Sequence, residues 1–191
     1  MKAAKKWIFS IAAALLIGVP VGVFAGTAVS AGVTTDATNQ LGTNPSSEQV
    51  RHELATLPYY GIFDNLGFSI QGDTVILEGQ VVKPITRSDA QARVSRVKGV
   101  SKVINNIQVL PLSSFDNAIR LREYRTIFRT GSLFRYAEGV NPGIHIIVSN
   151  GRVTLEGVVD TAADRQLAYI AANGVPGVFG VTNNLRVEAG K

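Results

Sequence analysis

Apolar and polar residues alternate along two stretches of the chain, and each stretch predicts a β-hairpin. The first stretch has Gly72-Asp73 between its two apolar runs, and the second has Ser149-Asn150-Gly151. Alternation with a period of two is typical of a strand with one buried face, and glycine beside aspartate or asparagine favours a tight turn. We expect strands at residues 68–71, 74–82, 144–148 and 152–159.

After each hairpin the apolar residues change to helical spacing. Ala90, Val94 and Val97 are four and three residues apart, which places them on one face of a helix. The same spacing recurs at Ala168, Ala172 and Val175. Gly99 and Gly177 then stand where each helix should end, in a left-handed backbone conformation that favours glycine. A last strand is expected after each glycine, at residues 100–109 and 178–187.

A further helix is expected before each hairpin. Ser46 with Gln49, and Ser113 with Asp116, have the spacing of residues that cap the first turn of a helix. The apolar positions of these two helices are Val50, Leu54 and Leu57, and then Leu121, Tyr124, Ile127 and Phe128. By the same spacing, Thr86 with Asp89 and Thr161 with Asp164 are the predicted starts of the two helices that follow the hairpins.

The two halves of the chain are copies of one unit. A shift of 78 residues aligns Gly72–Val109 with Asn150–Val187 without a gap, and 14 of the 38 positions are identical, which is well above chance for unrelated segments. A period this long is typical of duplicated small domains rather than of a solenoid repeat.

Together these elements predict an α+β fold of two tandem small domains with the order α-β-β-α-β. Each domain is expected to have a three-stranded mixed sheet packed on two helices, because a strand-helix-strand connection implies a parallel pair. We place the first domain at residues 46–110 and the second at residues 114–188, with a flexible linker at residues 32–45.

Residues 1–31 have the order of a signal peptide. Three lysines precede an uncharged apolar run, and small residues follow it. Cleavage after Ala25 and cleavage after Ala31 both fit the sequence. The alternative is an uncleaved membrane anchor, since the run from Trp7 to Ala25 is nearly long enough to cross a bilayer.

Charge and cysteine content exclude several classes of protein. The whole chain has 19 basic and 14 acidic residues, but three of the lysines lie in the predicted leader, and the remaining 16 basic residues nearly balance the acids. This balance disfavours a nucleic-acid partner. The chain has no cysteine, so disulfides, thiolate metal sites and lipid attachment through cysteine are excluded.

The repeated motifs resemble those of the BON domain, a family named for bacterial osmotically inducible periplasmic proteins and nodulation proteins. The resemblance lies in Val75-Ile-Leu-Glu-Gly-Gln-Val, Val97-Lys-Gly-Val and Val103-Ile-Asn-Asn-Ile-Gln-Val, and in their counterparts that begin at Val153, Val175 and Val181. It implies a periplasmic tandem protein that associates with phospholipid and maintains the envelope, for example under osmotic stress. The shared residues Gly79, Gly99, Asn105, Gly157, Gly177 and Asn183 are expected to serve the architecture.

The strongest local charge lies in the predicted helix that opens the second domain. Arg122, Arg125 and Arg129 fall on one face of it, opposite the apolar arc. With Arg135 and Tyr136 just beyond, they are candidate contacts for anionic phospholipid headgroups. The alternative is a solvated outer face with no ligand.

No residue set indicates catalysis, a metal or a cofactor. His52 and His145 have no partners at the spacing of metal ligands, and no nucleophile is paired with a base. We therefore expect an exported, non-enzymatic protein that contacts anionic phospholipid surfaces. The alternative is a protein-interaction or chaperone-like module with partners among envelope proteins.

Overall fold

The computed structural model describes residues 45–139 and 141–188. The predicted leader and almost all of the predicted linker lie outside these residues. The described residues belong to a single compact unit. It contains two separate hydrophobic cores, so this part of the chain can fold by itself.

The first copy of the repeat has a sheet in which β2 is the central strand. Its elements are α1 (Ser47–Ala55), β1 (Asn65–Gln71), β2 (Thr74–Val81), α2 (Pro84–Val94), β3 (Lys102–Asn105) and β4 (Gln108–Val109). β1 is antiparallel to β2, whereas β3 and β4 are parallel to it. The predicted mixed sheet is therefore confirmed.

The second copy repeats this topology and adds one short helix. Its elements are α3 (Ser114–Phe128), η1 (Leu133–Ala137), β5 (Ile144–Ser149), β6 (Arg152–Val159), α4 (Ala162–Asn173), β7 (Gly180–Asn183) and β8 (Arg186–Val187). β5 pairs with β6 antiparallel, and β7 and β8 pair with β6 parallel. The 3-10 helix η1 has no counterpart in the first copy and was not predicted.

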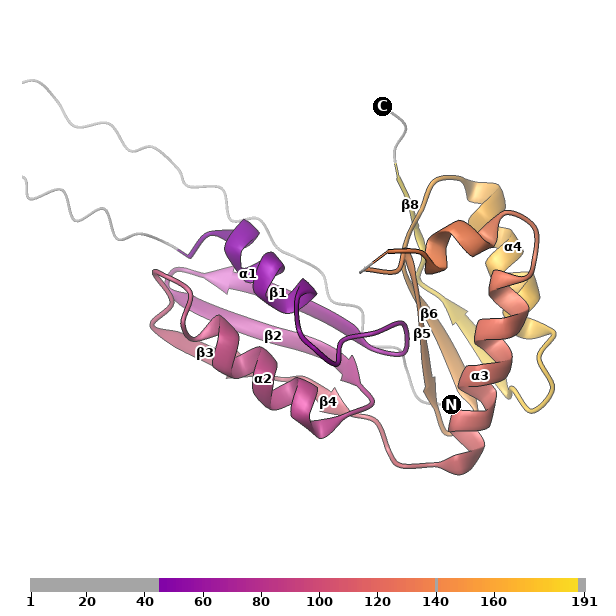
Figure 1. Ribbon diagram of the computed structural model, residues 1–191, viewed down its shortest axis with the longest axis horizontal. Helices are drawn as coiled ribbons and strands as arrows, with labels where there is room; N and C mark the ends of the chain where they lie inside the picture. Colours follow the sequence, from indigo (N-terminus) through magenta and orange to yellow (C-terminus); the bar gives the residue numbers. More distant parts are fainter. Residues whose placement is uncertain (1–44, 140, 189–191) are drawn as a thin grey trace, which may run out of the picture. The chain divides into compact units, whose positions relative to one another are not determined.

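Each sheet is packed on two helices, as Figure 1 shows for α1 and α2 and for α3 and α4. The first core joins Val50 of α1 and Val94 of α2 to Val75 and Leu77 of β2. The second joins side chains of α3, α4, β5 and β6, and those of Ile119, Ile127, Ile144, Ile146 and Leu155 are fully buried. Burial of a side chain of this size stabilises the fold by about 1.5–3 kcal/mol.

The last strand of each copy was predicted to be continuous, and it is in fact interrupted. In the first copy the Asn105 side chain accepts a hydrogen bond from the backbone N–H of Ile107 (3.1 Å) and donates one to the carbonyl of Arg87 (3.0 Å). Asn183 makes the matching bonds to Leu185 (3.2 Å) and Arg165 (3.0 Å). The asparagine therefore bends the chain, turns the next apolar residue into the core and ties the strand to the preceding helix.

Two of the four predicted helix starts are present as capped turns. Ser113 and Thr161 each accept a hydrogen bond from the backbone N–H three residues on. Ser46 precedes α1 without a side-chain cap. The prediction for Thr86 is wrong, because α2 begins at Pro84 and the Thr86 side chain is buried inside it. Proline is well suited to the first turn, where its missing N–H has no helical partner.

Candidate functional site

The helix α3 buries its two acidic residues and Arg120, and it exposes its other arginines. Its two acids, Asp116 and Glu123, are buried. Arg122 and Arg125 of the helix, and Arg129 at its C-cap, are exposed. A helix whose carboxylates are hidden in this way presents only positive charge to its surroundings. Together with Leu121 and Tyr124, these three arginines form what we call the α3 outer face.

The two buried carboxyl groups of α3 differ in their hydrogen bonding. The Asp116 carboxylate accepts hydrogen bonds from the backbone N–H groups of Asn150 (2.9 Å) and Gly151 (2.8 Å), and so fastens the helix to the β5–β6 turn. Glu123 is fully buried, and neither of its carboxyl oxygens has a hydrogen-bond partner. Burial raises the pKa of Glu123 to about 8, because an ionised carboxylate is costly away from water.

The three arginines of the outer face are available to a ligand. Arg122 donates one hydrogen bond to the carbonyl of Pro176 (3.1 Å). Within residues 45–139 and 141–188, none of the three lies within ion-pair distance of a carboxylate. No ion pair therefore neutralises their charge within these residues, and the exposed Glu138 lines the groove beside Arg125 and Arg129 without pairing with either.

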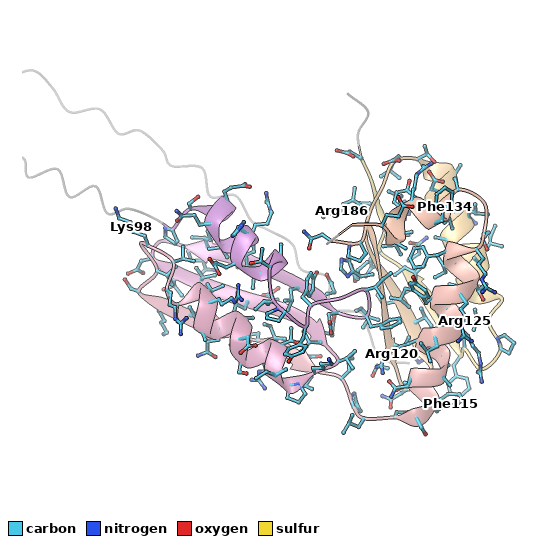
Figure 2. The ribbon with its side chains drawn as sticks, viewed as in Figure 1. Lys98, Phe115, Arg120, Arg125, Phe134 and Arg186 are labelled. Carbon is cyan, nitrogen blue, oxygen red and sulfur yellow. The ribbon has the colours of Figure 1, made fainter. Side chains whose placement is uncertain are left out.

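The predicted apolar arc of this helix was partly wrong. Ile127 and Phe128 are buried as expected, but Leu121 and Tyr124 are 50% and 41% exposed. Ile119 and Glu123 take the inward positions instead. A shallow groove of the outer face is lined by apolar side chains, by Arg125 and Arg129, and by one acid, Glu138; the apolar residues are Leu121, Tyr124, Phe128, Phe134 and Ala137. Figure 2 shows Phe115, Arg125 and Phe134 spread along α3, from its first turn to beyond its end.

Arg135 and Tyr136 belong to a different site, centred on Asp164. Arg135 pairs with Asp164 (2.8 Å) and Asp160 (3.1 Å). The Tyr136 hydroxyl donates to the Asp164 carboxylate (3.0 Å) and accepts from the backbone N–H of Asp160 (2.9 Å). The pKa of Asp164 is lowered, first by a hydrogen bond from Thr161 and then by a hydrogen bond from Tyr136 and the positive charge of Arg135. This network holds η1 to the start of α4, so Arg135 and Tyr136 are not part of the α3 outer face.

The sequence did not predict that β5, an edge strand, is covered by the segment between α1 and β1. The backbone N–H of Ile146 donates to the carbonyl of Ile62 (2.8 Å), and the buried Arg120 donates to the carbonyl of Val148 (2.7 Å). His145 lies against Tyr60, with 5.4 Å between ring centroids, and burial lowers its pKa. His145 therefore has a packing role here.

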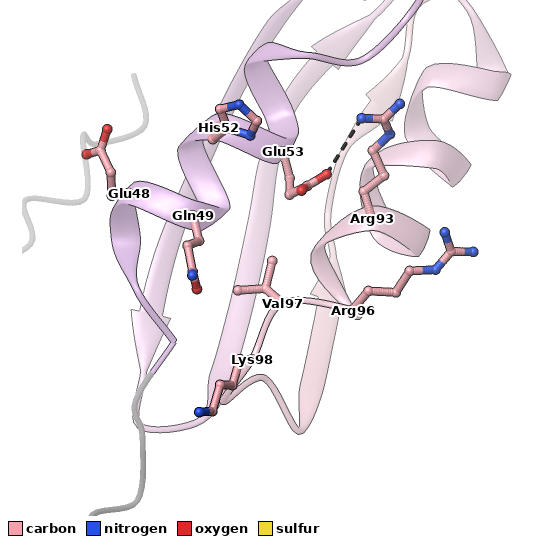
Figure 3. A pocket seen from close by; sticks show the side chains of 8 residues that line it. All are labelled: Glu48, Gln49, His52, Glu53, Arg93, Arg96, Val97 and Lys98. Atoms are coloured by element: carbon pink, nitrogen blue, oxygen red, sulfur yellow. Dashed lines mark ion pairs between the residues drawn. The ribbon is translucent and has the colours of Figure 1, made fainter.

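The first copy has no comparable basic face. Its groove between α1 and α2 has a volume of about 710 Å³ and is lined by Glu48 and Glu53 as well as by Arg93, Arg96 and Lys98. Figure 3 shows Glu53 paired with Arg93, at 3.6 Å. The acids lie on α1 and the basic residues lie on α2 or just after it, so the groove has charges of both signs and does not select for an anion.

Two further findings concern the described residues only. None of the helices within residues 45–139 and 141–188 is long and apolar enough to cross a bilayer. The same residues contain no cluster of three or more histidine or acidic side chains that could hold a metal ion.

Comparison with curated proteins found no match. Among solved structures, two chains of CdsD, a structural protein of the type III secretion system of Chlamydia trachomatis, are similar at 14% identity. They cover 75% of this chain and 92% and 97% of their own, with TM-scores of 0.28 and 0.27.

The family comparison agrees with the duplicated topology. The model of the BON domain matches residues 48–111 and again residues 135–189, which together are more than half of the chain. The first match runs from α1 to the end of the first sheet, and the second begins in η1. The helix α3 lies between the two matched ranges. The chain thus belongs to the BON domain family and has two of these domains in tandem.

Proposed function

We propose that this protein binds the surface of anionic phospholipid membranes through the α3 outer face. BON domains are binding domains without catalytic activity, and the family is generally linked to phospholipid binding and to envelope and osmotic stress. The observation that supports α3 as the contact is the burial of both its acids beside three exposed arginines.

Charge and apolar area on this face act together. An arginine near an anionic membrane surface contributes about 1 kcal/mol of binding free energy. Leu121, Tyr124 and Phe134 expose apolar area beside Arg125 and Arg129. Amphipathic surfaces of this kind lie in the plane of the membrane, with apolar side chains at the boundary between headgroups and acyl chains.

The site of action that we propose is the periplasm, at a membrane surface. BON-domain proteins are typically periplasmic or associated with the envelope. The leader predicted at residues 1–31 supports export, and the mass of the mature N-terminus from cells would distinguish a cleaved leader from a retained anchor.

Charge reversal on the outer face tests the proposal. The change is Arg122→Glu, Arg125→Glu and Arg129→Glu together in residues 40–191, which include the whole compact unit. Three lost contacts of about 1 kcal/mol each predict at least a 100-fold loss of affinity for phosphatidylglycerol vesicles in low salt. Co-sedimentation measures this, and wild-type binding should weaken as salt rises because exposed charges are screened.

The matched control makes the same change of net charge in the first domain. Arg87→Glu, Arg96→Glu and Lys98→Glu alter three exposed side chains and should leave most of the binding intact. Equal losses from both triple variants would show that net charge alone attracts the membrane. Absence of wild-type binding in low salt would overturn the proposal.

A protein partner is the alternative function, and the mixed-charge groove between α1 and α2 is the observation that favours it. Side chains of both signs suit a polar peptide surface better than a uniformly anionic one. Crosslinking in the envelope would recover such a partner. Its yield should fall in the Arg87, Arg96 and Lys98 variant and stay unchanged in the α3 variant.

A further inference from the structure

Two phenylalanines form an exposed pair at the beginning of α3. Phe115 lies in the first turn of the helix and Phe179 in the connection between α4 and β7, and they are 45% and 70% exposed. Their ring centroids are 5.9 Å apart, with 30° between the ring planes. Exposure of an aromatic side chain to water is unfavourable, so burial of Phe179 in an apolar environment would lower the free energy.

The pair is held by a fixed junction of three elements. The backbone N–H of Phe179 donates to the carbonyl of Gly151 (2.8 Å) in the β5–β6 turn, and Asp116 of α3 holds the same turn. Gly151 has a φ of 72°, and a Cβ there would lie 2.6 Å from the Phe179 ring. A side chain at position 151 would therefore displace the Phe179 ring, and glycine leaves space for it.

The fold itself does not require an aromatic residue at position 179. The equivalent of Phe179 in the first copy is Ser101, 78 residues earlier. Ser101 makes the same backbone hydrogen bond, from its N–H to the carbonyl of Asp73 (2.9 Å). Because serine forms the same turn, the backbone conformation here does not depend on an aromatic ring.

Basic side chains lie close to the pair. A Cβ at Gly177 would lie 3.5 Å from the Arg122 guanidinium and 3.6 Å from the Phe115 ring, and one at Gly180 would lie 3.5 Å from the Arg152 guanidinium. The pair is therefore continuous with the arginines of the α3 outer face. Since α3 has 15 residues, it separates this pair from Phe134 by about 20 Å.

We propose that the Phe115–Phe179 pair is a second apolar anchor, which inserts between the headgroups of the bilayer that the outer face binds. This rests on the proposed function. Two bulky rings enter a membrane where gaps between headgroups expose acyl chains, and such gaps increase with curvature and with unsaturated lipids. The partner is thus an anionic bilayer with loose headgroup packing. Both the charge of the lipids and the packing of their headgroups determine the affinity.

A fluorescent reporter at the tip of the pair tests insertion directly. The only tryptophan of the chain is Trp7, so Phe179→Trp in residues 40–191 gives a single probe. With small vesicles of unsaturated phosphatidylglycerol, we expect a blue shift of its emission and quenching by lipids brominated on the acyl chains. If the vesicles co-sediment the protein while the emission stays unchanged, insertion is refuted and the proposed function survives. If nothing co-sediments, the proposed function itself fails.

A second variant tests the preference for loosely packed bilayers. Phe179→Ser installs the residue of the first copy and should keep the stability of the fold. We expect about a tenfold loss of affinity for small unsaturated vesicles, and a much smaller loss for large saturated vesicles of equal charge. Ile85→Ser, at an exposed apolar position of α2, is the matched control and should change neither. Equal losses on both kinds of vesicle would overturn the packing preference.

Discussion

Replacing Glu123 with glutamine should abolish a loss of stability that the wild-type chain undergoes as the pH rises. The folded chain holds a proton on Glu123 up to about pH 8, whereas the unfolded chain releases it near its ordinary pKa of 4.5. Between these values the folded state binds more protons, so the free energy of unfolding falls as the pH increases. The fall is about 1.4 kcal/mol per pH unit in this window, and it ends above the folded pKa.

Urea denaturation of residues 40–191 at pH 5, 6.5, 8 and 9 measures this effect. Other titrating groups contribute to the wild-type curve, but they contribute equally to the variant, so the difference between the two curves isolates Glu123. Glu123→Gln should match the wild type near pH 5 and exceed its unfolding free energy by several kcal/mol at pH 8.

Two further variants show whether burial is the cause. Glu123→Leu should be more stable than the wild type at every pH, because it removes two buried oxygens that have no partner. Glu138→Gln changes an exposed carboxylate and should follow the wild-type curve. Parallel curves for the wild type and Glu123→Gln would show that the carboxyl group is solvated in the folded chain.

The protonation of Glu123 also bears on membrane binding. At neutral pH a carboxyl group with a pKa of about 8 is mostly uncharged, so it does not offset the arginines on the other side of the same helix. The other acid of α3, Asp116, is engaged with the β5–β6 turn. Among the charged residues of α3 and its C-cap, only Arg122, Arg125 and Arg129 reach solvent. These three arginines therefore make the electrostatic potential outside the helix positive.

The duplicated fold could be predicted because several identical residues of the two copies lie at positions where the backbone conformation requires that residue type. Asn105 and Asn183 close the bend in the last strand, and Gly79 and Gly157 share almost the same φ, 124° and 123°. These residues have little freedom to vary, so they mark the unit in the sequence. The bend itself was missed, since valine and isoleucine on both sides of Asn105 favour a continuous strand.

The orientation of α3 could not be predicted from its apolar pattern. Two inward positions hold the charged residues Arg120 and Glu123, so the buried face does not appear apolar in the sequence. Leu121 and Tyr124 are apolar but exposed, so they indicated the wrong face. Only tertiary contacts explain the inward charges: Arg120 reaches the edge of β5 at Val148, 28 residues away. The same holds for Arg135 and Tyr136, whose partner Asp164 lies about 30 residues on. Spacing within one helix contains no information on such partners.

Replacing Gly157 with alanine should destabilise the second domain by more than about 3 kcal/mol. Its φ of 123° is a conformation that residues with a side chain rarely adopt. In addition, a Cβ there would lie 2.2 Å from the carbonyl oxygen of Gly143. That oxygen is backbone and accepts a hydrogen bond from the N–H of Val158 (2.9 Å), so it cannot move aside without separating the beginning of β5 from β6.

The first domain and an open turn provide the comparison for this variant. Gly79→Ala should have an equally large effect on the first domain, because a Cβ there would lie 2.0 Å from the carbonyl oxygen of Asn65. Gly72 also has a positive φ, 63°, but has open space around it, so Gly72→Ala should cost only about 1 kcal/mol. Hydrogen exchange resolved by residue would assign each loss to its own domain. Similar losses for Gly72→Ala and Gly157→Ala would mean that backbone strain, and not the close approach of β5, determines the need for glycine at position 157.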